Sequence, residues 1–171
     1  MKKLIWFIAF FVSVQFAQAQ DIFNAVRTNQ IEEVQKYLAA GVNVNAANER
    51  GHSPLILAVY NNQPEMVKLL VSKGADVNAQ DKSGNNALMG ATFRGYPEMA
   101  KLLVENGADV NQVNLNGAST LIFAATFGQV EIAKILLEKG ADATIKDQTG
   151  KTALDHASLQ ENKELVELLK K

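Results

Sequence analysis

The sequence predicts an all-α repeat protein, in which helix-turn-helix repeats joined by hairpin loops stack into a solenoid. One glycine column recurs every 33 residues, at Gly51, Gly84, Gly117 and Gly150. A second column keeps the same spacing, at Gly41, Gly74, Gly107 and Gly140. The sequence around this second column also repeats, as LLVSKGADVNAQD, LLVENGADVNQVN and LLEKGADATIKD. Self-similarity at this period is typical of solenoids, because one repeat of this size cannot bury its own apolar face.

The composition is that of a globular protein with a single repeat domain. The chain has 171 residues, of which 47% are hydrophobic and 20% are charged, and shows no composition break after its first twenty residues. We place a signal peptide at 1–19 and the repeat domain at 20–171. The repeats are expected at about 21–50, 51–83, 84–116, 117–149 and 150–171.

The first twenty residues predict export. Lys2 and Lys3 form a basic start, residues 4–14 are almost all apolar, and residues 17–19 have the small-x-small form of a cleavage site. This apolar run falls short of the roughly 20 residues that a spanning helix needs, which favours cleavage after Ala19 over a retained membrane anchor. Fifteen asparagines of the mature chain lie outside any N-x-Ser/Thr pattern, and cysteines are absent. Both features favour a bacterial periplasm over a eukaryotic secretory route.

Charge and cysteine count exclude several kinds of site. Without the leader, 15 basic residues stand against 18 acidic ones and form no basic stripe, which argues against nucleic acid binding. The absence of cysteine excludes disulfides and thiolate metal sites. No residue pattern implies a cofactor or a metal.

The boundaries of the helices follow from local signals. Ser53 is a hydroxyl cap before Pro54, where a proline suits the first helical position. Pro64 begins the second helix of that repeat, and Gly74 ends it in the left-handed conformation. Small residues recur in the first helices and allow close packing: Ala58, Ala91, Ala124 and Ala157.

The two ends of the array differ from its middle, as capping repeats must. The first repeat has a clear second helix with Val34, Tyr37 and Leu38, but only a degenerate first helix around residues 22–27. The last outer helix, ENKELVELLKK, is charged and suits a solvent-facing cap.

The Gly-x-Ser-Pro-Leu stretch at Gly51 and the Gly-Ala-Asp-Val-Asn loops at Gly74 and Gly107 resemble ankyrin repeats. The resemblance covers residues 21–171 and implies paired antiparallel helices with projecting loops, stacked into a curved solenoid whose concave side binds protein. The family's Thr-Pro-Leu-His tetrapeptide lacks its histidine in every repeat, since Ile56, Met89, Ile122 and Asp155 stand there. We therefore expect contacts between repeats to depend more on apolar packing.

Three polar patterns, of which two recur in each repeat or loop, are best explained by structure. Acids in the first turn of each second helix interact favourably with the helix dipole and lie too far apart to share a metal: Glu32, Glu65, Glu98, Glu131 and Glu164. Asx side chains scaffold the loops: Asp76, Asp109 and Asp142, with Asn45, Asn78 and Asn111. Asp155, His156 and Ser158 have the residue types of a hydrolytic triad, but their spacing does not let them converge.

The best candidate for a binding surface is a set of variable positions on the first helices and loops. By resemblance these positions face the partner, and aromatic and Arg side chains are frequent interface anchors. Tyr60, Phe93 and Phe127 are expected to form an aromatic strip flanked by Arg27 and Arg94. The predicted binding residues are Arg27, Tyr60, Phe93, Arg94, Leu115, Phe127 and Leu159. The alternative is that some of the rings fill gaps in the core.

We interpret the chain as a non-catalytic module that binds another protein, expected to be a periplasmic enzyme that it inhibits, shields or stabilises. It is expected to be a monomer when unbound, with no membrane span after leader removal. Two other classes stay open: a self-assembling scaffold that uses the same surface, and a hydrolase that uses His156.

Overall fold

The computed structural model describes residues 21–170. The predicted signal peptide and its cleavage site lie outside these residues. Residues 21–27 are helical. The helices that follow are α2 (Ile31–Ala39), α3 (Pro54–Tyr60), α4 (Pro64–Ser72), α5 (Ala87–Arg94), α6 (Pro97–Glu105), α7 (Thr120–Thr126), α8 (Val130–Glu138), α9 (Ala153–Leu159) and α10 (Lys163–Leu169).

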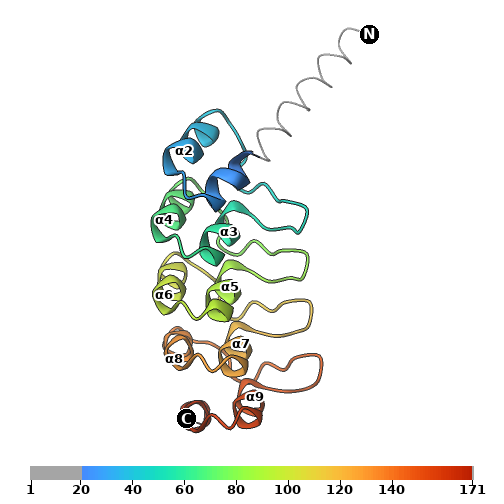
Figure 1. Cartoon of the computed structure of the whole chain (residues 1–171). Coiled ribbons are helices and arrows are strands. Elements are labelled where there is room, and N and C mark those ends of the chain that lie inside the picture. Colours follow the sequence, from blue (N-terminus) through green and yellow to red (C-terminus); the bar gives the residue numbers. More distant parts are fainter. Residues whose placement is uncertain (1–20, 171) are drawn as a thin grey trace, which may run out of the picture. The chain divides into compact units, whose positions relative to one another are not determined.

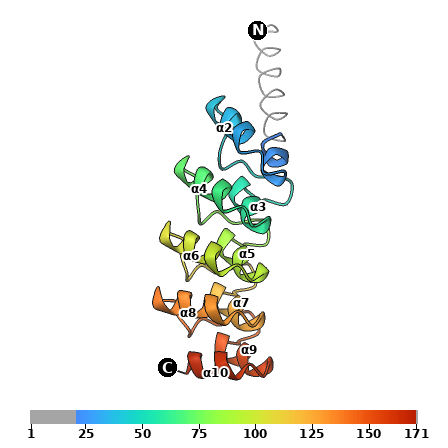
Figure 2. The ribbon, with the colours of Figure 1, turned by 60° about the vertical axis from the view of Figure 1, so that its left-hand side comes forward.

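The chain divides into two compact units, of which the first ends at Ala75 and the second begins at Asp76. In the first unit α3 packs against α4. In the second unit α5, α7 and α9 pack in one layer, α6, α8 and α10 form the other, and loops project from the first layer (Figures 1 and 2). The predicted helix-turn-helix repeat fold is confirmed. Outside the helices, the only strand-like pairing of residues 21–170 is one isolated bridge between Val113 and Ser119.

The predicted helix caps are present. Ser53 Oγ accepts a hydrogen bond from the N–H of Ile56 at 3.2 Å, and Asn86, Ser119 and Thr152 cap their helices in the same way. Each such cap contributes about 1 kcal/mol. Gly74 follows α4 at φ +84°, in the left-handed region, as expected. The repeated capping residues and glycines of the sequence therefore set the start and end of the helices.

The core is apolar at three of the four positions where the histidine is missing, and the fourth residue, Asp155, is exposed. Ile56, Met89 and Ile122 are at most 3% exposed. The first helix of the first repeat lies where the sequence places it, since residues 21–27 are helical and Ile22 and Val26 are fully buried. This segment carries Arg27 at its end, so its regularity matters for the site described below.

Side-chain hydrogen bonds also join the loops of successive repeats in the second unit. Asn78 Nδ2 donates to the carbonyl of Gly107 at 3.2 Å, and the N–H of Asp109 donates to Asn78 Oδ1 at 2.8 Å. Asn111 repeats both bonds one repeat later. Apolar packing is thus not the only contact between repeats, because these hydrogen bonds also fix the bases of the loops.

Candidate functional site

The loop tips are held by an Asx column directly before the first helices. Asn48 Oδ1 accepts hydrogen bonds from the N–H groups of Arg50 and His52 at 2.9 and 3.0 Å. Asn114 Oδ1 does the same for Asn116 and Ala118, at 2.9 and 3.1 Å. Asp81 and Asp147 occupy this column in the other repeats. The sequence analysis missed this column, although the 33-residue period places it in phase.

Two hollows lie where these turns meet the first helices. The first hollow belongs to the first unit and has a volume of about 640 Å³. It is lined by Arg27, Asn48, Arg50, His52, Leu57, Tyr60 and Asn61. The second hollow belongs to the second unit and has a volume of about 360 Å³. It is lined by Asn114, Asn116, Ala118, Ile122, Phe123, Thr126, Phe127, Asp147, Gln148, Thr149 and His156.

Three rings form an aromatic cluster on α5 and α7 and the residue after α7. Phe93 and Phe127 are 49% and 43% exposed, and their rings meet edge to face with centroids 5.0 Å apart. Phe123 lies 5.8 Å from Phe127 and extends the cluster into the second hollow. Partly exposed aromatic rings in this geometry offer a large apolar contact area with little freedom to lose on binding. Phe123 was missed by the sequence analysis.

The remaining predicted residues belong to both units. Tyr60 is half-buried in the first unit, with its ring 5.8 Å from that of His52. Arg94 turns to Tyr96, donating to its hydroxyl at 3.1 Å with the guanidinium 5.6 Å from the ring centre. Leu115 is 67% exposed at a loop tip, and Leu159 is 64% exposed at the end of α9. Arg27 is exposed and lines the first hollow.

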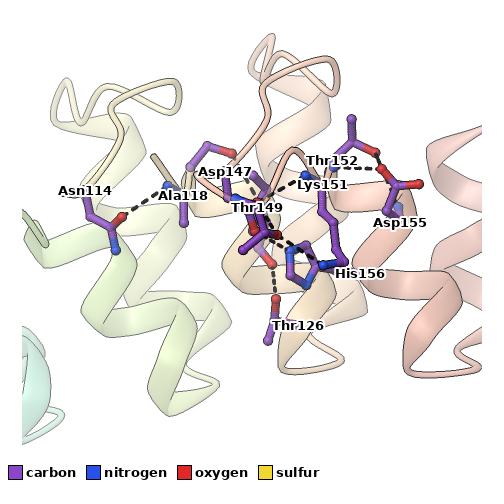
Figure 3. Close-up of polar contacts among 11 residues, drawn as sticks. Asn114, Ala118, Thr126, Asp147, Thr149, Lys151, Thr152, Asp155 and His156 are labelled. Atoms are coloured by element: carbon purple, nitrogen blue, oxygen red, sulfur yellow. Dashed lines mark hydrogen bonds and ion pairs between the residues drawn. The ribbon is translucent and has the colours of Figure 1, made fainter. Parts of the chain in front are cut away.

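An acidic and a histidine side chain meet at the edge of the second hollow (Figure 3). Asp147 Oδ2 lies 2.7 Å from His156 Nε2, and both side chains are largely buried. The Thr149 hydroxyl donates to Asp147 Oδ1 at 2.7 Å. Thr149 first, and then His156, hold the pKa of the Asp147 carboxyl well below its usual range. The signal in the sequence was His156 itself, which stands where the other repeats have Leu57, Gly90 and Phe123.

Among the described residues, the Asp147–His156 pair lacks the hydroxyl nucleophile of a hydrolytic site. The Ser158 hydroxyl donates to the carbonyl of Leu154 in its own helix at 2.8 Å. Within the described part of the chain, no Ser or Thr hydroxyl is hydrogen-bonded to His156. The contact between Asp147 and His156 ties the loop to α9.

The acidic column has the structural role expected of it. Each of its members lies in the first turn of a second helix. Glu65 pairs with Lys68 at 2.7 Å, and Glu164 pairs with Lys134 at 3.1 Å. Over residues 21–170, no group of three His, Cys, Asp or Glu side chains converges as a metal site would require. The same residues include no helix that is both long and apolar enough to span a membrane.

Two family models match the chain. The model described as ankyrin repeats (3 copies) matches residues 22–114, which is more than half of the sequence. The model described as ankyrin repeats (many copies) matches residues 103–157. No curated protein was found to match the sequence.

Proposed function

Because the chain belongs to the ankyrin repeat family, whose members are generally protein–protein interaction modules, we propose that its second unit binds a partner protein. The binding surface consists of the aromatic cluster, the second hollow and the loop tip at Leu115. The observation that carries this proposal is the exposure of apolar side chains on this surface.

All large hydrophobic side chains of residues 21–170 that are strongly exposed lie in the second unit: Phe93, Val113, Leu115, Phe127 and Leu159. Val113 and Leu115 are informative because the fold does not require them. Their columns hold polar residues in the neighbouring loops, namely Gln80, Lys82, Lys146 and Gln148. Apolar residues that replace polar ones on a surface favour a protein contact.

The partner that we propose is a periplasmic enzyme, which the chain inhibits, shields or stabilises. The leader-like first twenty residues and the absence of cysteines support export to a periplasm. A repeat array with loops tied by hydrogen bonds loses little conformational freedom on binding, which suits it to cover a folded partner. Amino-terminal sequencing of the mature protein tests the cleavage of the leader, and a chain that begins at Gln20 is the expected result.

The exposed apolar surface also fits a second copy of the chain. Self-association would make the protein a scaffold instead of an adaptor for another protein. Light scattering at rising protein concentration separates the two, because our proposal expects a constant monomer mass.

The proposal is tested by affinity purification from a periplasmic extract of the source organism, followed by mass spectrometry. The bait is the wild-type protein, and the Phe93→Ala/Phe127→Ala variant removes the exposed rings. Leu137→Ala is the matched control, because it removes a half-buried apolar side chain from α8, in the other helix layer.

We expect one partner to be captured by the wild type and by the Leu137→Ala variant, and to be lost with the double variant. Circular dichroism must show that all three proteins fold alike. If both variants retain the same set of proteins as the wild type, the aromatic cluster is packing and the proposal fails.

A further inference from the structure

The first hollow is cationic. Arg27 and Arg50 both line it, and both are exposed. No acidic residue belongs to its lining. In the described part of the chain, no ion pair joins either guanidinium to a carboxylate. Two arginines without an ion pair among the described residues therefore line one hollow.

The backbone holds both arginines in place. Arg50 sits on the turn that Asn48 closes, and Gly51 follows it at φ +81°. Arg27 ends the first helical segment, and its carbonyl accepts a long hydrogen bond of 3.5 Å from Gln63 Nε2. Gln63 is itself 9% exposed and stands directly before α4. The origins of both side chains are thus set by the fold, which lowers the cost of ordering them on a ligand.

The wall of the hollow is partly aromatic. The rings of Tyr60 and His52 lie at an angle of 33°, with centroids 5.8 Å apart, and the largely buried Leu57 also belongs to the lining. A volume of about 640 Å³ falls in the range of 300–1,000 Å³ that is typical of ligand sites. Such a hollow accepts a side chain with an apolar stem and an anionic end.

We propose that the first hollow binds an acidic segment of the partner protein, with Asp or Glu carboxylates paired to Arg27 and Arg50. The inference rests on the proposed function and adds the charge of the segment that the partner presents. A guanidinium matches a carboxylate in planar, bidentate geometry, which gives specificity as well as attraction. The net negative charge of the chain works against extended polyanions, so the attraction is local to this hollow.

A direct binding experiment tests the charge requirement. A fluorescein-labelled peptide of alternating Glu and Leu is titrated with the protein expressed from the complete sequence, and fluorescence anisotropy is recorded. The Gln–Leu peptide is the uncharged probe of the same shape. The test variant is Arg27→Gln/Arg50→Gln. Lys68→Gln/Lys73→Gln removes the same charge from α4 and its carboxyl end, away from the hollow, and is the matched control.

We expect the Glu–Leu peptide to bind at least about tenfold more tightly than the Gln–Leu peptide, because charge-assisted hydrogen bonds are the strong ones. The arginine variant should lose this difference, and the lysine variant should keep it. Equal binding of the two peptides by the wild type overturns the inference. So does an arginine variant that still prefers the acidic peptide. Inorganic phosphate and free glutamate are also tested as competitors of the labelled peptide. If phosphate displaces the peptide at the same concentration as glutamate does, the hollow is a site for small anions, and the inference is overturned.

The same variants separate this inference from the proposed function. In the affinity purification, a partner that is kept by the Arg27→Gln/Arg50→Gln variant and lost with the Phe93→Ala/Phe127→Ala variant overturns the acidic segment and leaves the proposed function standing. A partner that both variants lose supports the two together.

Discussion

The two hollows are the same site of the repeat, found two repeats apart in the sequence, and their chemistry differs. Asn48 and Asn114 close the turn in both. The lining then changes in register: Arg50 becomes Asn116, His52 becomes Ala118, Leu57 becomes Phe123, Tyr60 becomes Thr126, and Asn61 becomes Phe127. The first hollow is cationic and the second is aromatic. The difference shows that the repeat fixes where the hollow lies, while its lining side chains decide what it can bind, including Arg27 in the first hollow and Asp147 and His156 in the second.

Removing the Asx residue that closes the turn in both hollows should have the largest effect on stability. Asn114→Ala removes the acceptor of two backbone N–H groups and the donor of a 2.9 Å bond to Asn85, at a site only 8% exposed. We expect a loss of about 2–3 kcal/mol in the free energy of unfolding, measured with urea, because buried donors are left unpaired. Asn48→Ala, at a half-buried turn, should cost about 1 kcal/mol.

Asn114→Asp is the control for this prediction, since Asp81 and Asp147 close the same turn in other repeats. It should retain most of the stability. If the alanine and aspartate variants are equally destabilised, the two backbone bonds are not what holds the turn.

One substitution replaces an aromatic side chain of the second hollow with the polar residue that the first hollow has at the same position. Phe127→Asn installs the residue that the first hollow has at Asn61. We expect the affinity for the captured partner to fall by about 2 kcal/mol, as for an interface anchor, and the stability to change by less than about 1 kcal/mol because the ring is 43% exposed. Calorimetric titration and urea unfolding measure the two. Equal losses of affinity and stability would place Phe127 in the core.

The smallest effect that we expect is a difference between the two hollows in how acid changes stability. The Asx column holds a carboxylate at Asp147 and a neutral amide at Asn48. Thr149 and His156 lower the pKa of Asp147 in the folded state. The unfolded chain therefore takes up the proton first, so this stabilisation is full above about pH 4 and is lost as the pH falls through the folded pKa.

The pKa values of Asp142 and Asp155 are also lowered, chiefly by hydrogen bonds from Thr144 and Thr152. All three aspartates belong to the second unit. Urea midpoints measured between pH 7 and pH 3 should fall less for Asp147→Asn than for the wild type. Parallel curves for the two proteins would show that Asp147 does not titrate as we expect.

The fold could be predicted because its signals are local and repeated. Ser53-Pro54, Pro64 and Gly74 each fix one helix end, and the 33-residue period carries the same signals through the array. The first helix of the first repeat was expected only in degenerate form because residues 21–27 lack the Ser-Pro entry, although Ile22 and Val26 complete its buried face.

The site could be predicted only in part. Exposed apolar residues in variable columns, such as Phe93 and Leu115, could be found by aligning the repeats. The Asp147–His156 pair could not, because it depends on how the loop approaches α9 over a separation of nine residues. The orientation of Arg94 toward Tyr96 is likewise a choice among rotamers that no sequence pattern reports.

If the partner covers the loop and first-helix face of the second unit, hydrogen exchange of the complex will show it most directly. Binding should slow amide exchange at residues 113–118 and at the end of α7, and leave α6 and α8 unchanged. Protection confined to α6 and α8, with residues 113–118 exchanging as in the free protein, would contradict the account.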